Sequence, residues 1–211
     1  MPYHSYIFFD GIPGAPKKAK EAFAKRIAKE KRVRTRAYAT LGFKRGTHFM
    51  LHCNTKAPDI IQEFIRDLLH TELGKYLRIS YTLLGMTRSS QYNPKKPPAQ
   101  SAPEAPHRYL VVYPFTKTVE WHLLPYDERR AMMKAHVEVG RAYASSISQL
   151  LLYSFGIDDH EFIVSYQMDD LDEFQQLVME LRGTEGRRYT KNDTPIFTCT
   201  HMPVAEALEM L

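Results

Sequence analysis

The sequence predicts an α+β fold of two tandem ferredoxin-like halves that pack together as a dimeric α+β barrel-type core. Three observations predict it. Strand-like and helix-like segments follow a β-α-β-β-α-β order twice, a proline-rich stretch separates the two series, and several residues recur at matching positions in both. Because each half has helices on one sheet face only, the remaining sheet faces are expected to cover each other.

Residues 1–92 form the first predicted half. Its strands are expected at 6–9, 36–42, 47–53 and 76–85, and its helices at 16–31 and 58–73. Pro58 suits the first position of the second helix, where a missing amide hydrogen costs nothing. In the last strand, Leu77 and Ile79 alternate with Arg78 and Ser80, which is typical of a half-buried strand.

A linker and a second half follow. Residues 93–107 contain five prolines and no large apolar residue, which indicates an extended connector. In residues 108–211, strands are expected at 108–115, 149–156, 161–168 and 195–200, and helices at 126–145 and 169–182. Asp170 and Glu173 have the spacing of an N-terminal helix cap.

The two halves share residues at equal distances from a reference phenylalanine. Thr71 follows Phe49 by 22 positions, and Thr184 follows Phe162 by the same interval. A glutamate comes directly after each threonine, and a tyrosine stands 27 positions after each phenylalanine. This pattern indicates internal repetition.

Composition is ordinary for a globular protein, with 44% hydrophobic and 25% charged residues in 211. The first residues contain no long apolar run, so neither a signal peptide nor a membrane span is expected. Two cysteines without metal-ligand spacing favour a reduced, cytoplasmic protein. Ten of the basic residues behind the net charge of +5 lie in residues 17–36, beside two glutamates. We interpret this stretch as a solvated helix face, with an anion-attracting surface as the alternative.

A histidine stands on the apolar side of the helix expected at 126–145. Met132, His136, Val139 and Tyr143 recur at helical spacing. One interpretation is a buried neutral histidine bonded to a backbone carbonyl. The other is a metal ligand: Gly140, one turn later, costs about 1 kcal/mol relative to alanine but leaves room for a broad, flat group. Neutral imidazole is a common ligand of haem iron.

Gln149 begins a very apolar strand, "QLLLYSFG". If its amide is buried it needs a partner. That partner is either the backbone at the strand start or a ligand whose open coordination position faces a neutral group.

The stretch from "YPFTKTVEWHLL" through "AHVEVGRAYASSISQLLLYSFGIDDHEF" to "MELRGTE" resembles the C-terminal half of chlorite dismutase-like haem proteins. Within that family the chain is most similar to the coproheme decarboxylases. "YATLGFKRGTHFMLHC" and "YLRISYTLLGMTRSSQY" extend the resemblance to nearly the whole chain, mainly as signatures of the fold.

The resemblance implies roles for individual residues. His136, in "HVEVGRAY", matches the proximal iron ligand, and Gln149 matches the distal position, where chlorite-degrading members have arginine. Tyr113 matches a tyrosine that becomes a radical, and Lys117 a lysine near a reacting propionate. The resemblance also implies contacts with the cofactor site for Arg141, Arg182, Glu185 and Trp121. Glu185 would be a hydrogen-bond partner of the histidine. Trp121 would either line the haem pocket or anchor a loop.

Three features depart from the family pattern. The connection from Tyr113 to the histidine helix is short, His122 stands where an aromatic residue is usual, and the linker offers no clear propionate-binding arginine. These departures concern the anchoring of the substrate more than the haem site.

The function implied is peroxide-dependent decarboxylation of two propionates of Fe-coproporphyrin III (coproheme) to haem b through a tyrosyl radical. The implied partners are coproheme, hydrogen peroxide and further copies of the chain in a closed ring, a pentamer, with no nucleic acid. Alternatives are a chlorite dismutase or haem peroxidase on the same fold, and a non-catalytic haem carrier or sensor. An RNA-binding ferredoxin-like protein is a further alternative, since "RGTHFMLH" faintly matches an RNA-recognition strand; Thr47 and His52 replace the expected stacking aromatics.

Overall fold

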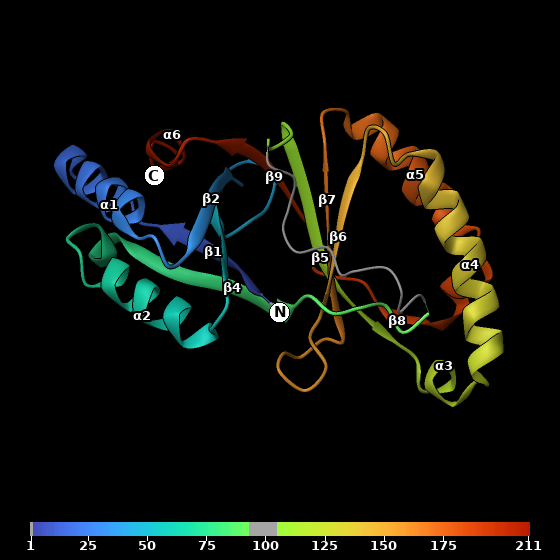
Figure 1. Cartoon of the computed structure of the whole chain (residues 1–211). Helices are drawn as coiled ribbons and strands as arrows, with labels where there is room; N and C mark the ends of the chain where they lie inside the picture. The colour runs from blue at the N-terminus through green and yellow to red at the C-terminus, as the bar shows by residue number, and fades with distance from the viewer. Residues whose placement is uncertain (1, 93–104) are drawn as a thin grey trace. The chain divides into compact units, whose positions relative to one another are not determined.

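The structure is a computed structural model that describes residues 2–92 and 105–211 (Figure 1). Contacts divide the chain into two compact units, Met1–Thr87 with Phe197–Leu211, and Arg88–Ile196. Most of the predicted linker lies outside the described residues. Among those that are described, no helix combines the length and apolarity required to cross a membrane.

The first unit contains a five-stranded antiparallel sheet in the order β4-β1-β3-β2-β9. Its strands are β1 (Tyr3–Gly11), β2 (Arg34–Ala39), β3 (Phe49–Thr55), β4 (Leu77–Met86) and β9 (Phe197–Met202). The first four have the ferredoxin-like order, in which β1 and β3 are the central strands and β4 and β2 lie outside them.

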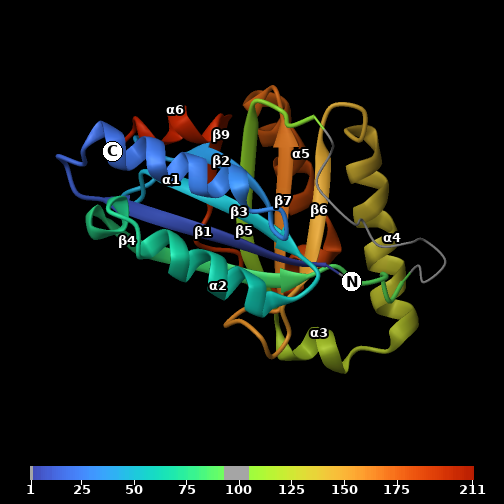
Figure 2. The same ribbon diagram turned by 60° about the vertical axis from the view of Figure 1, so that its left-hand side comes forward.

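Two helices cover one face of this sheet, α1 (Lys17–Lys29) and α2 (Pro58–Leu69) (Figures 1 and 2). Their apolar stripes, which include Phe23 and Phe64, pack on strand residues such as Phe9 and Leu51 in one buried cluster. Pro58 opens α2 as predicted. The short helices η1 (Leu73–Tyr76) and α6 (Val204–Leu208) complete the unit.

The second unit contains a sheet in the order β6-β7-β5-β8. Its elements are β5 (Tyr109–Lys117), α3 (Val119–Leu123), α4 (Tyr126–Ala142), β6 (Ser148–Tyr153), β7 (Phe162–Met168), α5 (Leu171–Arg182), η2 (Glu185–Tyr189) and β8 (Thr190–Asn192). Helices α4 and α5 lie on one face, where Val139 and Leu177 meet a cluster that includes Val111 and Val164. The side chain of Asp170 caps α5 through the amide of Asp172, at 2.8 Å.

The predicted α+β fold with ferredoxin-like halves is confirmed. The contacts differ from the predicted boundaries at two places. Residues 88–92 group with the second unit. The larger difference is that residues 197–211 group with the first unit rather than with 108–196. The reason is strand pairing over a long sequence distance: β9 pairs with β2, with Ala39 opposite Thr200. Cys53 and Cys199 are free and buried, on β3 and β9.

The predicted repetition extends to matching hydrogen bonds. The hydroxyl of Thr71 donates to the carbonyl of Leu68 at 2.7 Å, after α2. The hydroxyl of Thr184 donates to the carbonyl of Leu181 at 2.7 Å, after α5. Each threonine therefore closes the C-terminal end of its helix, where backbone carbonyls lack helical partners.

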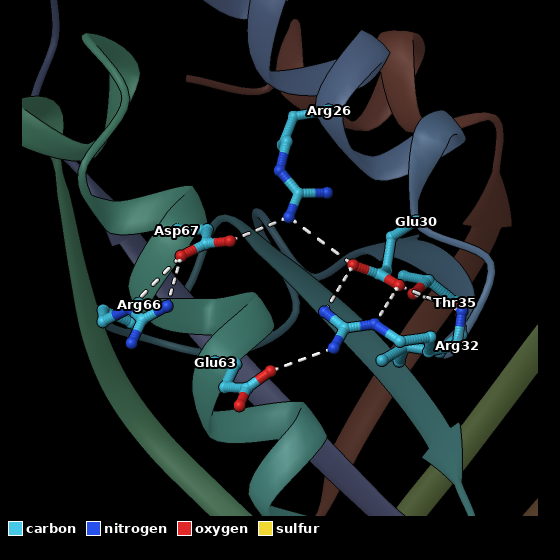
Figure 3. A network of polar contacts seen from close by, with 8 residues as sticks. Arg26, Glu30, Arg32, Thr35, Glu63, Arg66 and Asp67 are labelled. Atoms are coloured by element: carbon cyan, nitrogen blue, oxygen red, sulfur yellow. Dashed lines mark hydrogen bonds and ion pairs between the residues drawn. The ribbon is translucent and has the colours of Figure 1, made fainter.

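Part of the basic segment is neutralised by an ion-pair network between α1 and α2 (Figure 3). Glu30 accepts from Arg32 at 3.0 Å and from Arg26 at 3.5 Å. Arg26 also donates to Asp67 at 2.9 Å, and Arg32 to Glu63 at 3.0 Å. The hydrogen bonds from Arg32 lower the pKa of Glu30 to about 2.

Replacing Glu30→Gln is expected to lower the free energy of unfolding by about 1 kcal/mol at pH 7, the scale of a networked surface ion pair. The folded-state pKa of Glu30 lies below its ordinary value of 4.5, so this contribution is present above pH 4.5 and is lost as the pH falls towards 2. Urea unfolding at pH 7 and pH 3 measures both effects. Glu21→Gln, an exposed change on α1, is the control; equal losses in the two variants would contradict the network's role.

Candidate functional site

The residues singled out in the sequence all belong to the second unit. Their positions are β5 for Tyr113 and Lys117, α3 for Trp121, α4 for His136 and Arg141, β6 for Gln149, α5 for Arg182, and η2 for Glu185. Lys117, Trp121 and His136 form one group, and Tyr113 and Gln149 belong to a second. Arg182 lies near Tyr113, whereas Arg141 and Glu185 are exposed and join neither group.

Helix α4 covers this face only in part. It follows Pro125, with Asp127 and Glu128 in its first turn, where negative charge favours the helix dipole. None of its residues is fully buried. A methyl group added at Gly140 would meet no atom within 4 Å. The open space expected beside this glycine is therefore present in the structure.

The imidazole of His136 is held through Thr184. Its Nδ1 atom lies 3.5 Å from Thr184 Oγ1. Because the threonine hydroxyl donates to the carbonyl of Leu181, its oxygen is left to accept from Nδ1–H. The hydrogen is then on Nδ1, and Nε2 carries the lone pair that a metal ion binds.

The protonation state of His136 also favours metal binding through Nε2. Burial lowers the pKa of this imidazole, and the nearby positive charge of Lys117 lowers it further. The neutral ring, which is the form that binds iron, is therefore favoured at neutral pH.

Glu185 was expected to orient His136. Here its carboxylate pairs with Arg188 at 3.2 Å, and its side chain is 67% exposed. The hydroxyl of Thr184, one residue earlier, makes the contact with the ring instead. The difference arises because Glu185 begins the helix η2, while Thr184 still caps α5.

Lys117 and Trp121 form the first group together with His136. The amine of Lys117 donates to the carbonyl of Gly186 at 3.1 Å and lies 4.5 Å from the centre of the Trp121 ring. Burial, assisted by the charge of Arg187, lowers the pKa of Lys117 to about 8. Trp121 is 2% exposed, and its ring also lies beside Tyr189, so it supports the lysine as well as the loop after β5.

Tyr113 and Gln149 belong to the second group, which is joined by Tyr166. The ring centres of Tyr113 and Tyr166 are 6.2 Å apart. The amide nitrogen of Gln149 donates to the hydroxyl of Tyr166 at 3.2 Å. Gln149 is exposed, so its amide is not buried, and its partner is a tyrosine side chain rather than the backbone at the strand start. The reason is its face: Leu150 points into the core, whereas Gln149 points to the side that α4 covers only in part.

Two arginines share one carboxylate near Tyr113. Arg182 donates to Asp193 at 3.0 Å and Arg187 donates to it at 2.6 Å. The charges of both arginines lower the pKa of Tyr113, while Asp193 and burial raise it, with burial the largest cause. Arg141 is exposed in the last turn of α4.

Sequence reasoning missed four residues of this arrangement: Tyr166, Thr184, Arg187 and Asp193. Thr184 carried a signal, since it recurs as Thr71 in the first half. The other three had none, because an aromatic residue on a strand and charges on a loop are common in any globular protein.

The family model for chlorite dismutase matches residues 15–202. The chain belongs to the chlorite dismutase family. A coproheme decarboxylase from Mycolicibacterium smegmatis is 29% identical over 175 residues, which cover 82% of this chain and 75% of that protein.

Solved structures of the family share the fold. A mutant chlorite dismutase from Candidatus Nitrospira defluvii matches with a TM-score of 0.88 at 22% identity, covering 99% of this chain and 94% of that one. A putative chlorite dismutase matches with a TM-score of 0.86 at 20% identity, covering 100% and 99%.

Members of this family include haem-dependent enzymes, and the residues described here fit an iron porphyrin. With Nδ1 of His136 facing Thr184, Nε2 is the ring nitrogen that can bind iron, and the open space at Gly140 lies one helical turn further along α4. Lys117, Arg182 and Arg187 supply positive charge for carboxylates. The fit rests on these donors and on the space beside α4.

Replacing Thr184→Val is expected to release the tautomer of His136, because the valine offers no acceptor to Nδ1–H. Nitrogen-15 NMR of ligand-free protein at pH 8 should show mainly Nδ1–H in the wild type and a mixture of tautomers in the variant. Thr184→Ser should retain the wild-type signal. Thr71→Val removes the matching helix-end bond in the first unit and should leave His136 unchanged; a mixture in the wild type would contradict the assignment.

Proposed function

We propose that the protein decarboxylates two propionates of coproheme oxidatively to vinyl groups, using hydrogen peroxide, and so forms haem b. The observation that supports this most is that one unit contains a half-buried phenol, an imidazole and a lysine. The phenol is Tyr113, which is hydrogen-bonded to Tyr166. The imidazole of His136 is available to bind iron, and the pKa of Lys117 is lowered. The resemblance to a curated coproheme decarboxylase supports the same reaction.

Binding would use the neutral imidazole and the cations. His136 would hold the iron through Nε2. Lys117, Arg182 and Arg187 would receive carboxylates of the substrate, the arginines by exchanging Asp193 for a propionate. With a pKa of about 8, Lys117 is mostly protonated at pH 7, and pairing with a carboxylate would strengthen its charged form.

The iron porphyrin supplies the oxidising chemistry once peroxide reaches it. Tyr113 would lose one electron and its hydroxyl proton, and the phenoxyl radical would then take a hydrogen atom from a propionate. Loss of a second electron and of carbon dioxide leaves the vinyl group. For each propionate, one peroxide is reduced to two waters.

The distal side favours this reaction over chlorite chemistry. Gln149 offers an uncharged amide that donates to Tyr166. It supplies no fixed positive charge to hold and polarise an oxychlorine anion, as an arginine would. The proposal also includes two properties: assembly into a closed ring of five copies, which follows from the family resemblance, and a cytoplasmic location.

The test is a titration of the coproheme-loaded protein with peroxide, followed by mass spectrometry of the porphyrin. The wild type should lose carbon dioxide and two hydrogens for each of two propionates. Tyr113→Phe should bind coproheme but lose at least about 100-fold in rate, since it removes a group that reacts directly. Tyr109→Phe, a change on the same strand, should react like the wild type. An unchanged porphyrin mass in the wild type, or rapid oxygen release from chlorite, would contradict the proposal.

A further inference from the structure

Tyr166 lies on β7, between the strands that carry Tyr113 and Gln149. In the register of the sheet, Gln149 on β6 stands directly opposite Tyr166. On the other side, Val111 of β5 stands opposite Tyr166, and Tyr113 is the next residue of β5 on the same face. The backbone pairing alone therefore brings these three polar side chains together.

Their hydrogen bonds run in one direction. The amide of Gln149 donates to the hydroxyl oxygen of Tyr166 at 3.2 Å. A hydrogen bond between the two phenols lowers the pKa of Tyr113 and raises that of Tyr166. Because the Tyr166 oxygen already accepts from Gln149, its own hydroxyl hydrogen is available to donate to Tyr113, whose ring centre lies 6.2 Å from that of Tyr166.

The position of Tyr166 is fixed by packing. Its side chain is buried, with 5% of the residue exposed. Its ring packs against Phe174 of α5, with ring centres 5.1 Å apart. Burial is the largest cause that raises its pKa, so its hydroxyl hydrogen is retained.

We infer that Tyr166 is a positioning residue for Tyr113: its hydroxyl, oriented by Gln149, donates to the Tyr113 oxygen and directs the Tyr113 hydrogen away from β7. This inference rests on the proposed function. It adds a residue whose own hydroxyl neither binds the porphyrin nor reacts.

The direction of this bond matters for the radical. A phenol that receives a hydrogen bond from Tyr166 must send its own hydrogen elsewhere, on the side of the sheet where α4 leaves space. When Tyr113 loses an electron and that proton, its oxygen remains an acceptor, so the bond from Tyr166 persists. When the radical takes a hydrogen atom from the substrate, a C–H bond breaks and the O–H bond of Tyr113 reforms, while Tyr166 keeps its hydrogen throughout.

The test is Tyr166→Phe, which removes one oxygen and keeps the ring. In ligand-free protein labelled with carbon-13 at tyrosine Cζ, the Tyr113 signal, identified from Tyr113→Phe, should titrate at higher pH in the variant. Asp193, Arg182 and Arg187, the charges that act on Tyr113, remain in place. Tyr153→Phe, a change on β6, is the control and should leave the Tyr113 titration unchanged.

In coproheme-loaded protein, Tyr166→Phe should lower kcat by roughly 3- to 10-fold, the effect of one hydrogen bond, with KM for coproheme unchanged. High-field EPR after peroxide should show the Tyr113 radical with a larger gx value, because the phenoxyl oxygen has lost a donor. The KM and the EPR signature separate this role from a general loss of structure.

The outcomes are distinct. A Tyr113 titration that Tyr166→Phe leaves unmoved refutes the hydrogen bond. A moved titration with unchanged kcat and gx refutes its role in the reaction. Wild-type protein that leaves coproheme unchanged refutes the proposed function, and this role with it, whatever the NMR titration shows.

Discussion

The antiparallel pairing of β7 with β5 and β6 is the constraint on which the candidate site depends. Every residue of β7 is buried, so a shift in register would move its whole set of apolar side chains to the opposite face. The same register sets Gln149 opposite Tyr166 and brings Tyr113 within reach. The polar residues of this group thus take their positions from the core beneath them and not from a flexible loop.

Helix α4 is held differently. Its C-terminal part packs on the sheet through Val139 and Tyr143, while the helix as a whole has no fully buried residue. The free energy that orders it comes in part from helix-end interactions and contacts with α5. His136 is oriented by the threonine that closes α5, so one hydroxyl serves the fold through Leu181 and the imidazole through Nδ1. In the first unit, Thr71 makes the corresponding helix-end bond to the carbonyl of Leu68.

Much of this could be predicted from the sequence. Periodicity located the main helices and strands, and local chemistry located the helix starts at Pro58 and Asp170, since both signals lie within a few residues of the element they define. The pairing of β9 with β2 could not be predicted in this way, because it joins segments about 160 residues apart. For the site, the resemblance implied that Glu185 orients His136 and that Gln149 lies at the distal position; the structure places Glu185 beside Arg188, and Gln149 is exposed. The role of Tyr166 could not be predicted from the sequence, because a tyrosine in an apolar segment such as "FIVSYQM" is common in buried strands.

The proposed function depends most directly on a bond between His136 and iron. Resonance Raman spectra of the protein loaded with coproheme and reduced to the ferrous state measure the iron–imidazole stretch. We predict that the band is present in the wild type, absent in His136→Ala, and regained when free imidazole is added to the variant. The same band in both proteins without added imidazole would show that another residue binds the iron, and would contradict the account.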